Sequence, residues 1–402
     1  MPFKNPFDVA PKRAAELPGQ KNATGELGEH APDALADSEK APPPPPGEPL
    51  ALAFTGTAEA YARLWFTGLF LSLVTLGLYS PWSKVARERY LASHTLLDGV
   101  PFVYQGSPLP ILKGRVAAAA ILGAGWGLAT YAPSLGPWLL ALAILVAPWF
   151  LLQTLAFDAA NYSWRGLRFR FRAPYREAAV AVLPLLVWPA ADIAAQFADN
   201  PSNPLLLAFP YLVLALTWPW MVSAITRMRF GGLRYGTADF ALAATGKDFY
   251  TVYFRGMGGA FVTLGVVALI AVIVLGRYGG PNTAAMLQSV VFVGISAFAI
   301  GMARGRRFNL GLHRLTGGGR IRFRSTLEPK RLAKLFALNA LWVVGTAGLA
   351  SPWRRIVTLR ERVRHVTAYV DGPLGWVRRA EPVGAGTTGS ALAEGIDFDL
   401  SL

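Results

Sequence analysis

The sequence lacks cysteine and carries few charged residues for its length. With no cysteine among the 402 residues, disulfides and thiolate metal sites are excluded. Charged residues make up 16% of the chain, whereas about 25% is typical of soluble domains. Residues 1–6 (Met-Pro-Phe-Lys-Asn-Pro) lack the basic start and apolar core of a signal peptide. Membrane targeting is therefore expected to come from internal apolar segments.

Recognisable catalytic and metal-binding patterns are also missing. The four histidines, His30, His94, His313 and His365, lie far apart and have no metal-ligand spacing. Gly246-Lys247 lacks the surrounding glycine and hydroxyl residues of a phosphate-binding loop. No Gly-x-Ser-x-Gly and no paired carboxylates occur. We therefore assign no catalytic, cofactor-binding or metal-binding residue, and we do not expect an enzyme.

Long apolar segments are what the sequence does contain. Hydrophobic residues make up 53% of the chain, and most of the segments approach the roughly 20 residues that a membrane-spanning helix needs. The segments cover about 60–79, 116–132, 137–157, 178–197, 204–226, 256–275, 283–303 and 332–350. They predict an all-α polytopic membrane protein with six to eight apolar helical segments arranged in hairpins.

Polar tails flank this membrane domain, which is expected over residues 51–379. Residues 1–50 contain eight acidic and five basic residues and end in the proline run 42–46, so we expect disorder. The proline run is either a stiff spacer or a ligand for a groove-type binding module. Residues 380–402 are expected to form a flexible acidic tail.

Basic residues in the connectors predict the orientation. The links 133–136 and 198–203 contain no Lys or Arg and 276–282 contains only Arg277, whereas 80–115, 158–177, 227–255 and 304–331 are all basic. Because basic connectors stay on the cytoplasmic side, segments two to seven should form three membrane hairpins. This arrangement also explains the net charge of +15, so nucleic-acid binding is not expected.

The first and last segments break this charge rule if they cross the membrane. A crossing would place the tails and the basic run 354–379 outside. We therefore expect both segments to enter the cytoplasmic half of the bilayer and return. Both end in the same structural motif, Ser80-Pro81-Trp82 and Ser351-Pro352-Trp353, where proline disfavours helix.

These two ends are internal repeats. Residues 77–82 match 348–353 without a gap, and the Arg-Glu-Arg at 87–89 matches 360–362 after a shift of two residues. The Asp-Gly at 98–99 matches 371–372 with the same shift. Such repeats are common in transporter folds but do not by themselves demonstrate transport.

A further pattern lies in the basic connectors. An aromatic follows a glycine by three residues in Gly99/Phe102, Gly166/Phe169 and Gly232/Tyr235. Arginines alternate with apolar residues in two places, which predicts short β-hairpins with one arginine face each. The arginines are Arg168, Arg170, Arg172, Arg320, Arg322 and Arg324. They either contact anionic lipid headgroups or a phosphorylated ligand, or serve only as topology signals.

Two features of the apolar segments need separate interpretation. Gly123 and Gly127 form a Gly-xxx-Gly pattern, which favours helix packing. Asp192 is an ionisable residue near the outer end of its segment. Its position favours interfacial solvation over a proton relay.

One long stretch resembles a known family. Phe54-Thr-Gly56, residues 75–85 (Thr-Leu-Gly-Leu-Tyr-Ser-Pro-Trp-Ser-Lys-Val), Arg89-Tyr90, Asp98-Gly99 and 102–106 (Phe-Val-Tyr-Gln-Gly) together resemble the YjgN family of bacterial inner-membrane proteins. The acidic ending 395–402 is similar to that of the family. The resemblance implies a multi-pass protein of the bacterial inner membrane, without an activity to transfer.

The sequence leaves three classes of function. A lipid-binding or envelope-organising membrane protein, with membrane lipids and anionic ones among them as expected partners, explains the arginine strands. A transporter or channel for a small solute is the alternative, and it would need polar residues near the bilayer midplane. An intramembrane enzyme is the class that the residues favour least.

Overall fold

The computed structural model describes residues 46–198, 204–254 and 281–372, together with Val266, Ile270 and Val377. Of residues 205, 206 and 281–292 it describes the backbone. Apart from Val266 and Ile270, the apolar segment 256–275 lies outside the described residues, as do the acidic tail and nearly all of the proline-rich tail. The first strand begins at Glu48, within the last residues of the expected N-terminal tail.

The described helices cover seven of the expected apolar segments, and two further helices, at 80–94 and 351–364, follow the first and the last of these segments. In chain order they are α1 (Ala58–Val74), α2 (Ser80–His94), α3 (Pro108–Tyr131), α4 (Gly136–Asn161), α5 (Tyr175–Val182), α6 (Val187–Gln196), α7 (Pro204–Gly231), α9 (Pro281–His313), α10 (Pro329–Gly345) and α11 (Ser351–Arg364). The 3₁₀ turn Leu183–Leu186 joins α5 to α6, and Pro133–Leu135 precedes α4.

Four helical stretches of the described residues are long and apolar enough to cross a membrane. They are Pro108–Tyr131, Pro133–Asn161, Tyr175–Gln196 and Leu207–Gly231. Each therefore has the length that a bilayer core of about 30 Å requires. They form the two hairpins that the uncharged links predicted. α1 and α10, at 17 residues each, are shorter.

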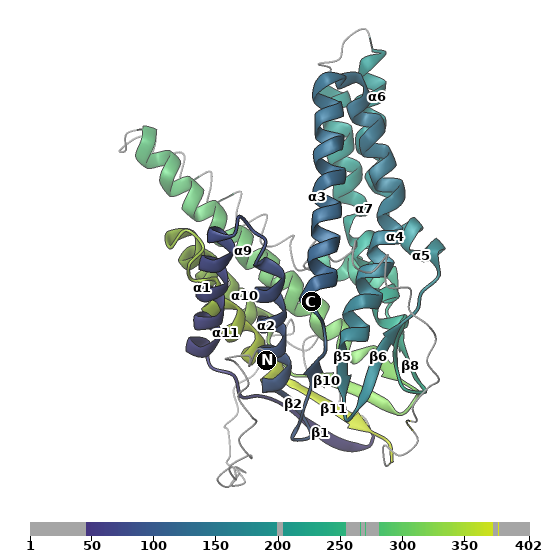
Figure 1. Ribbon diagram of the computed structural model, residues 1–402, viewed down its shortest axis with the longest axis vertical. Coiled ribbons are helices and arrows are strands. Elements are labelled where there is room, and N and C mark those ends of the chain that lie inside the picture. The colour runs from purple at the N-terminus through teal and green to yellow at the C-terminus, as the bar shows by residue number, and fades with distance from the viewer. Residues whose placement is uncertain are drawn as a thin grey trace, which may run out of the picture. The chain divides into compact units, whose positions relative to one another are not determined.

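The chain also forms a sheet, which the all-α prediction missed. Its strands are β1 (Glu48–Phe54), β2 (Thr95–Leu97), β3 (Val100–Pro101), β4 (Val103–Tyr104), β5 (Tyr162–Trp164), β6 (Leu167–Phe171), β7 (Leu233–Tyr235), β8 (Ala238–Leu242), β9 (Leu315–Gly317), β10 (Ile321–Ser325) and β11 (Val366–Val370). The eleven strands pair in the order β3-β2-β1-β11-β10-β9-β8-β7-β6-β5-β4. They lie together at one end of the long helices (Figure 1).

This sheet returns almost to its starting point. The two ends of the strand order, β3 and β4, are consecutive in the chain with only Phe102 between them. Longer strands pass from one neighbour to the next: β6 pairs through Leu167 and Arg168 with β5, and through Phe169–Phe171 with β7. All pairs are antiparallel. The predicted β-hairpins exist, but they join into one ring of strands.

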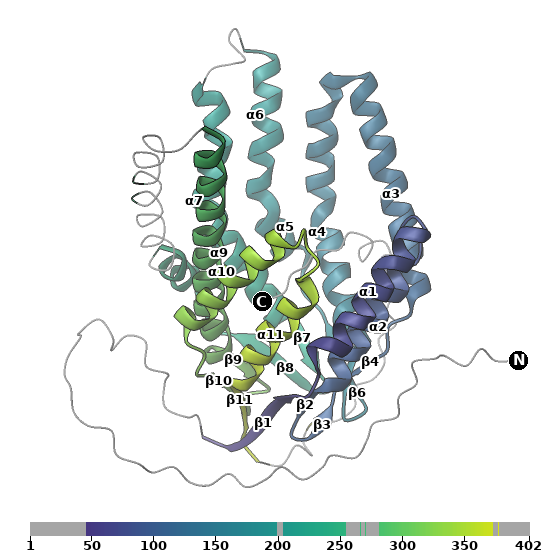
Figure 2. The same ribbon diagram turned by 90° about the vertical axis from the view of Figure 1, so that its left-hand side faces the viewer.

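Five repeats of strand, helical segment and strand build this ring. They run from β1 to β2, from β3 to β5, from β6 to β7, from β8 to β9 and from β10 to β11. Consecutive repeats meet at tight turns, such as Asp98-Gly99 and Arg165-Gly166, where both residues adopt positive φ. The last repeat meets the first through pairing of β11 with β1. The helices rise from this ring (Figure 2).

Aromatic side chains fill the inner face of the ring. Trp164, Tyr235 and Phe240 are buried in one cluster, with Phe102 and Phe169 packed against them. Phe169 and Tyr235 lie 4.9 Å apart between ring centroids. The aromatics of the glycine-aromatic pattern therefore meet in one core. Gly99 and Gly166 occupy turns, whereas Gly232 precedes its strand and Gly236 takes the turn position.

The Ser-Pro-Trp motifs begin helices rather than interrupting them. α1 ends at Val74, and Leu76 and Gly77 reverse the chain with φ of 50° and 91°. Ala347 and Gly348 repeat this turn with φ of 49° and 91°. Pro81 and Pro352 then lie in the first turn of α2 and α11, where the missing N–H costs nothing. The prediction that Pro81 breaks the apolar helix was wrong.

The two-residue offset between the first and the last repeat lies later in the chain than the Arg-Glu-Arg motifs predicted. Arg89 Nη2 donates to Gly106 O at 3.1 Å, and Arg360 Nη2 donates to Gly56 O at 2.9 Å. Gly106 follows β4 of the second repeat, and Gly56 follows β1 of the first repeat. Each glycine therefore belongs to the next repeat around the ring. Arg89 therefore corresponds to Arg360 without a gap, and the two extra residues belong to β11.

Close helix packing occurs at glycines other than the predicted pair. A Cβ at Gly68 of α1 would collide with the Ser83 side chain of α2. A Cβ at Gly301 of α9 would lie 2.7 Å from the Phe336 Cβ of α10. A Cβ at Gly123 or Gly127 would meet no described atom within 4 Å, so this Gly-xxx-Gly packs nothing within the described chain.

Candidate functional site

A cavity of about 810 Å³ lies between the helices and the inner face of the sheet. Its walls come from α1, α2, α4, α7, α9, α10 and α11, and strands β2 and β4 to β7 contribute the remainder. The helices α4 and α7 reach it only through their ends nearest the sheet, at Thr154–Ala159 and at Arg229 and Phe230. Segments from all five repeats therefore meet at one cavity.

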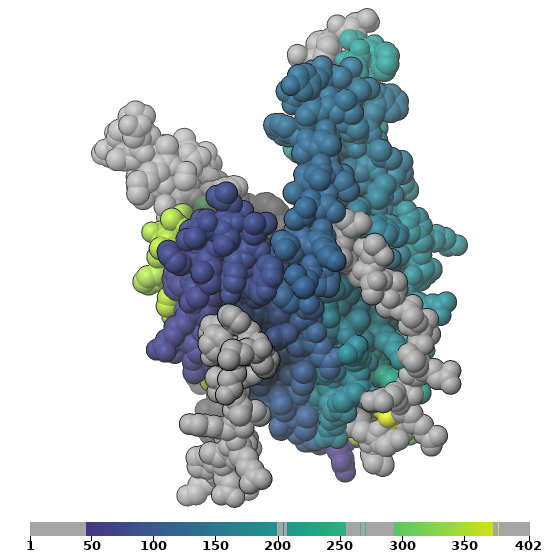
Figure 3. All heavy atoms as spheres, viewed as in Figure 1, coloured from purple at the N-terminus to yellow at the C-terminus, as the bar shows by residue number. Residues whose placement is uncertain are grey.

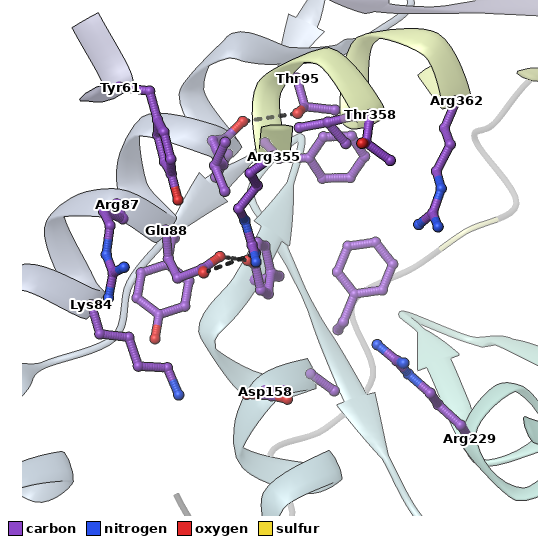
Figure 4. Close-up of a pocket in the computed structure, with 18 of the residues that line it drawn as sticks. Tyr61, Lys84, Arg87, Glu88, Thr95, Asp158, Arg229, Arg355, Thr358 and Arg362 are labelled. Atoms are coloured by element: carbon purple, nitrogen blue, oxygen red, sulfur yellow. Dashed lines mark hydrogen bonds and ion pairs between the residues drawn. The ribbon is translucent and has the colours of Figure 1, made fainter. Parts of the chain in front are cut away.

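Positive charge dominates the lining. The basic lining residues are Lys84, Arg87, Arg229, Arg304, Arg354, Arg355 and Arg362, and the acidic ones are Glu88 and Asp158. In Figure 4, Lys84 and Arg87 lie to one side of Glu88, and Arg229 and Arg362 lie to the other. Seven cations facing two carboxylates attract anions, and the attraction is stronger away from bulk water.

Glu88 connects three elements at the edge of this cavity. The Tyr162 hydroxyl of β5 donates to Glu88 Oε2 at 2.8 Å, and Arg355 Nη2 of α11 lies 3.5 Å from Glu88 Oε1. Burial, and then the neighbouring Glu88 charge, raise the pKa of Tyr162 well above its usual range. Tyr162 is therefore a protonated hydrogen-bond donor at neutral pH, and its hydroxyl satisfies one carboxylate oxygen of Glu88.

The remaining lining is apolar and aromatic. Phe169 and Phe171 reach the cavity from β6 and Phe102 from the link between β3 and β4, and the ring centroids of Phe102 and Phe169 are 6.3 Å apart in a stacked arrangement. Phe336 of α10 also lines it, and the Arg304 guanidinium lies 5.4 Å from the centre of that ring. The cavity thus offers a cationic part and an apolar part, which suits a ligand with both characters.

The six predicted arginines do not line this cavity. Arg168 and Arg170 alternate with the inward-facing Leu167, Phe169 and Phe171, so they lie on the opposite face of the sheet. On β10, Arg322 and Arg324 alternate in the same way with Ile321 and Phe323. Three strands, β7, β8 and β9, separate the two arginine strands. The structure therefore does not gather these arginines into one site, and their contact with lipid stays a prediction.

The other predicted residues have local roles or exposed positions. Ser80 Oγ donates to Gly77 O and accepts from Arg115 Nη1, both at 2.6 Å. Ser351 Oγ donates to Gly348 O in the same way. Trp353 is exposed, whereas Trp82 is half-buried. Asp192 is exposed near the end of α6. No cluster of metal-ligating side chains occurs within the described ranges.

The spacing of the cavity residues in the sequence carries a signal that their charge alone does not. Lys84, Glu88 and Leu91 recur at spacings of four and three, which places them on one face of α2. On α11, Arg354, Thr358 and Arg362 recur at spacings of four and likewise share one face. This periodicity could have indicated two basic helix faces, but their convergence depends on the ring of strands.

Four candidate spans above a ring of strands define a multi-pass integral membrane protein. The chain belongs to the family described as "Bacterial protein of unknown function (DUF898)", whose model matches residues 49–395. It is 24% identical over 344 residues to the "Inner membrane protein YjgN" of Salmonella typhimurium, covering 76% of this chain and 85% of that protein. No solved structure matches the chain. The expected YjgN family and bacterial inner-membrane location are thus confirmed.

Proposed function

We propose that this membrane protein binds the phosphate-bearing headgroup of an anionic membrane lipid in the cavity. The observation that carries the proposal is the cluster of seven cations and two carboxylates beside the aromatic side chains of Phe102, Phe169 and Phe171. Arginine supplies planar donor pairs that match phosphate oxygens, and six of the seven cations are arginines.

Size and position support a lipid headgroup. Sites for small molecules commonly measure about 300–1,000 Å³, and a cavity of about 810 Å³ falls in that range. It lies at the sheet ends of α4 and α7, where we place the headgroup region at the end of these candidate spans. A headgroup at this level leaves its acyl chains in the adjoining leaflet. Each basic residue near a charged membrane surface contributes about 1 kcal/mol of attraction, so the set matters more than any member.

Transport of a small anionic solute is the second candidate. The same cationic cavity would hold such a solute. However, α4 and α7 contribute lining residues only at their ends nearest the sheet. The described cavity lining therefore gives no polar path along these two helices toward the other side of the membrane. The lipid-binding proposal therefore accounts for more of the described structure.

The test compares arginines inside and outside the cavity. Full-length protein in nanodiscs would carry Arg229→Gln with Arg362→Gln, or the matched control Arg320→Gln on an exposed arginine that does not line the cavity. Retention of phosphatidylglycerol relative to phosphatidylcholine would be measured by mass spectrometry after delipidation. We expect the cavity variant to lose anionic selectivity and the control to keep it.

A pair of lysine replacements guards against simple misfolding. Arg229→Lys with Arg362→Lys keeps the charge but removes the planar guanidinium. We expect partial retention and an unchanged melting temperature. Unchanged selectivity in the glutamine variant would remove the cavity as the lipid site. Selective retention of inorganic phosphate or a soluble phosphate ester, with no lipid, would favour the solute instead.

A further inference from the structure

We propose that the α1–α2 and α10–α11 hairpins are two lipid-contacting surfaces that enter the cytoplasmic leaflet tip first and return without crossing. The occupant of both surfaces is the acyl-chain region of the bilayer that α3, α4, α6 and α7 span. This inference rests on the hairpins and is independent of what the cavity binds.

Both hairpins begin and end at the sheet. β1 leads into α1, α2 leads into β2, and β1 pairs with β2 through Leu52–Phe54. In the last repeat, β10 leads into α10, α11 leads into β11, and β10 pairs with β11. Each hairpin therefore returns to the side from which it started. The basic connectors assign the sheet to the cytoplasmic side.

The tips and outer sides of both hairpins are apolar and uncovered. Leu76 at the first tip is 95% exposed, and Trp342 near the second tip is 67% exposed. Other large exposed apolar residues on the two hairpins are Phe70, Leu73, Val74, Leu78, Leu338, Val344, Leu349 and Trp353. An apolar area of this kind on a described surface marks contact with lipid or another protein.

The returning helices limit how deep the tips can reach. Lys84 lies only four residues after Ser80, and Arg354 three residues after Ser351. At about 1.5 Å per residue, the first cation lies roughly 6 Å from the start of α2 and roughly 4.5 Å from the start of α11. A crossing hairpin would carry the charges of α2, including Lys84 and Arg87, through the hydrocarbon, at a cost of about 2.5–3.5 kcal/mol for each. Entry into one leaflet leaves these charges near the headgroups.

Continuity with the spanning helices favours lipid over a protein partner. α2 packs against α3, and α1 packs against α11, so the two hairpins adjoin each other and a candidate span. Figure 3 shows the α1–α2 surface, in purple, beside the lower part of α3, in blue. The α3 face also exposes Ile121, Leu122 and Trp126. The hairpin tips thus extend an apolar surface that the bilayer already covers.

Because the chain has no cysteine, single-cysteine variants give a direct test. Leu76→Cys and Leu349→Cys place a thiol at each tip. Ser134→Cys, in the link between α3 and α4, is the control for the far side, and Thr55→Cys, beside the sheet, is the control for the cytoplasmic side. All four residues are exposed, so each replacement leaves the core unchanged.

We expect an impermeant maleimide to label Ser134→Cys in intact cells and Thr55→Cys only after the cells are opened. Both tip cysteines should react at least about tenfold more slowly than Thr55→Cys, because acyl chains exclude the charged reagent. A polarity-sensitive dye on either tip should be quenched by lipids labelled in the upper half of the acyl chain.

Three results would overturn the proposal. Labelling of either tip in intact cells would mean that the hairpin crosses. Rapid labelling of both tips after opening would place them in water. Oxidative cross-linking of one tip cysteine to that of a second copy would make the surface a protein interface.

Discussion

Arg355 Nη2 of α11 lies 3.5 Å from Glu88 Oε1 of α2, and this pair joins the last repeat to the first beside the cationic cavity. The Glu88 side chain is 21% exposed, and its second oxygen accepts the Tyr162 hydroxyl. One carboxylate therefore links three repeats and reduces the positive charge of the cavity.

Glu88→Gln tests both the link between the repeats and the reduction of the cavity's positive charge. The glutamine can still accept from Tyr162 but no longer offsets Arg355, so we expect a loss of about 1 kcal/mol in the free energy of unfolding. Binding of anionic lipid should become tighter, because the cavity gains one unit of net positive charge. Thermal unfolding and lipid titration measure the two effects, with the exposed Glu59→Gln as control. Weaker lipid binding by an intact Glu88→Gln fold would speak against an anionic ligand.

Gly68→Leu should disrupt the first hairpin. Any Cβ at residue 68 collides with Ser83, and overpacking of this kind costs about 1–3 kcal/mol or more. Gly123→Leu is a matched control, because it has the same helix propensity change in open space. The amount of folded protein extracted from membranes should fall only for Gly68→Leu. Equal yields would show that α1 and α2 do not approach this closely.

His313 should make stability depend on pH. Burial lowers the pKa of His313 below its usual 6.5, and this outweighs the contact of its Nε2 with Ser325 O at 2.9 Å, which favours the protonated ring. The unfolded chain then binds a proton that the folded chain does not, so the free energy of unfolding decreases as pH falls through about 6.5. Between pH 7.5 and pH 5.5, the melting temperature of His313→Gln should decrease less than that of the wild-type protein. The same decrease in both proteins would locate the titrating group elsewhere.

The six arginines predicted as lipid contacts, which lie on β6 and β10 or directly next to them, provide a separate comparison. Replacing all six with lysine keeps the charge that sets topology but removes the guanidinium. Since none of them lines the cavity, we expect tightly bound anionic lipid to remain. Mass spectrometry of the purified variant measures this directly. Loss of the lipid with orientation retained would assign recognition to the arginine face instead.

The sequence predicted the membrane class, the α3–α4 and α5–α7 hairpins and the likeness of the two chain ends, because these depend on local hydropathy and motifs. It did not predict the ring, since β1 pairs with β11 across most of the chain and several strands have only two or three residues. Such pairing leaves no local period. The convergence of Glu88, Tyr162 and Arg355 could not be predicted either, because three distant segments supply them.

The most direct measurement is the identity and amount of lipid bound to wild-type protein purified in mild detergent. Native mass spectrometry, with lipid extraction from the same sample, would give both. We predict a phosphate-bearing anionic lipid that stays bound through delipidation and is lost in Arg229→Gln with Arg362→Gln. Wild-type protein that keeps its fold but carries no anionic lipid after reconstitution with phosphatidylglycerol would contradict it.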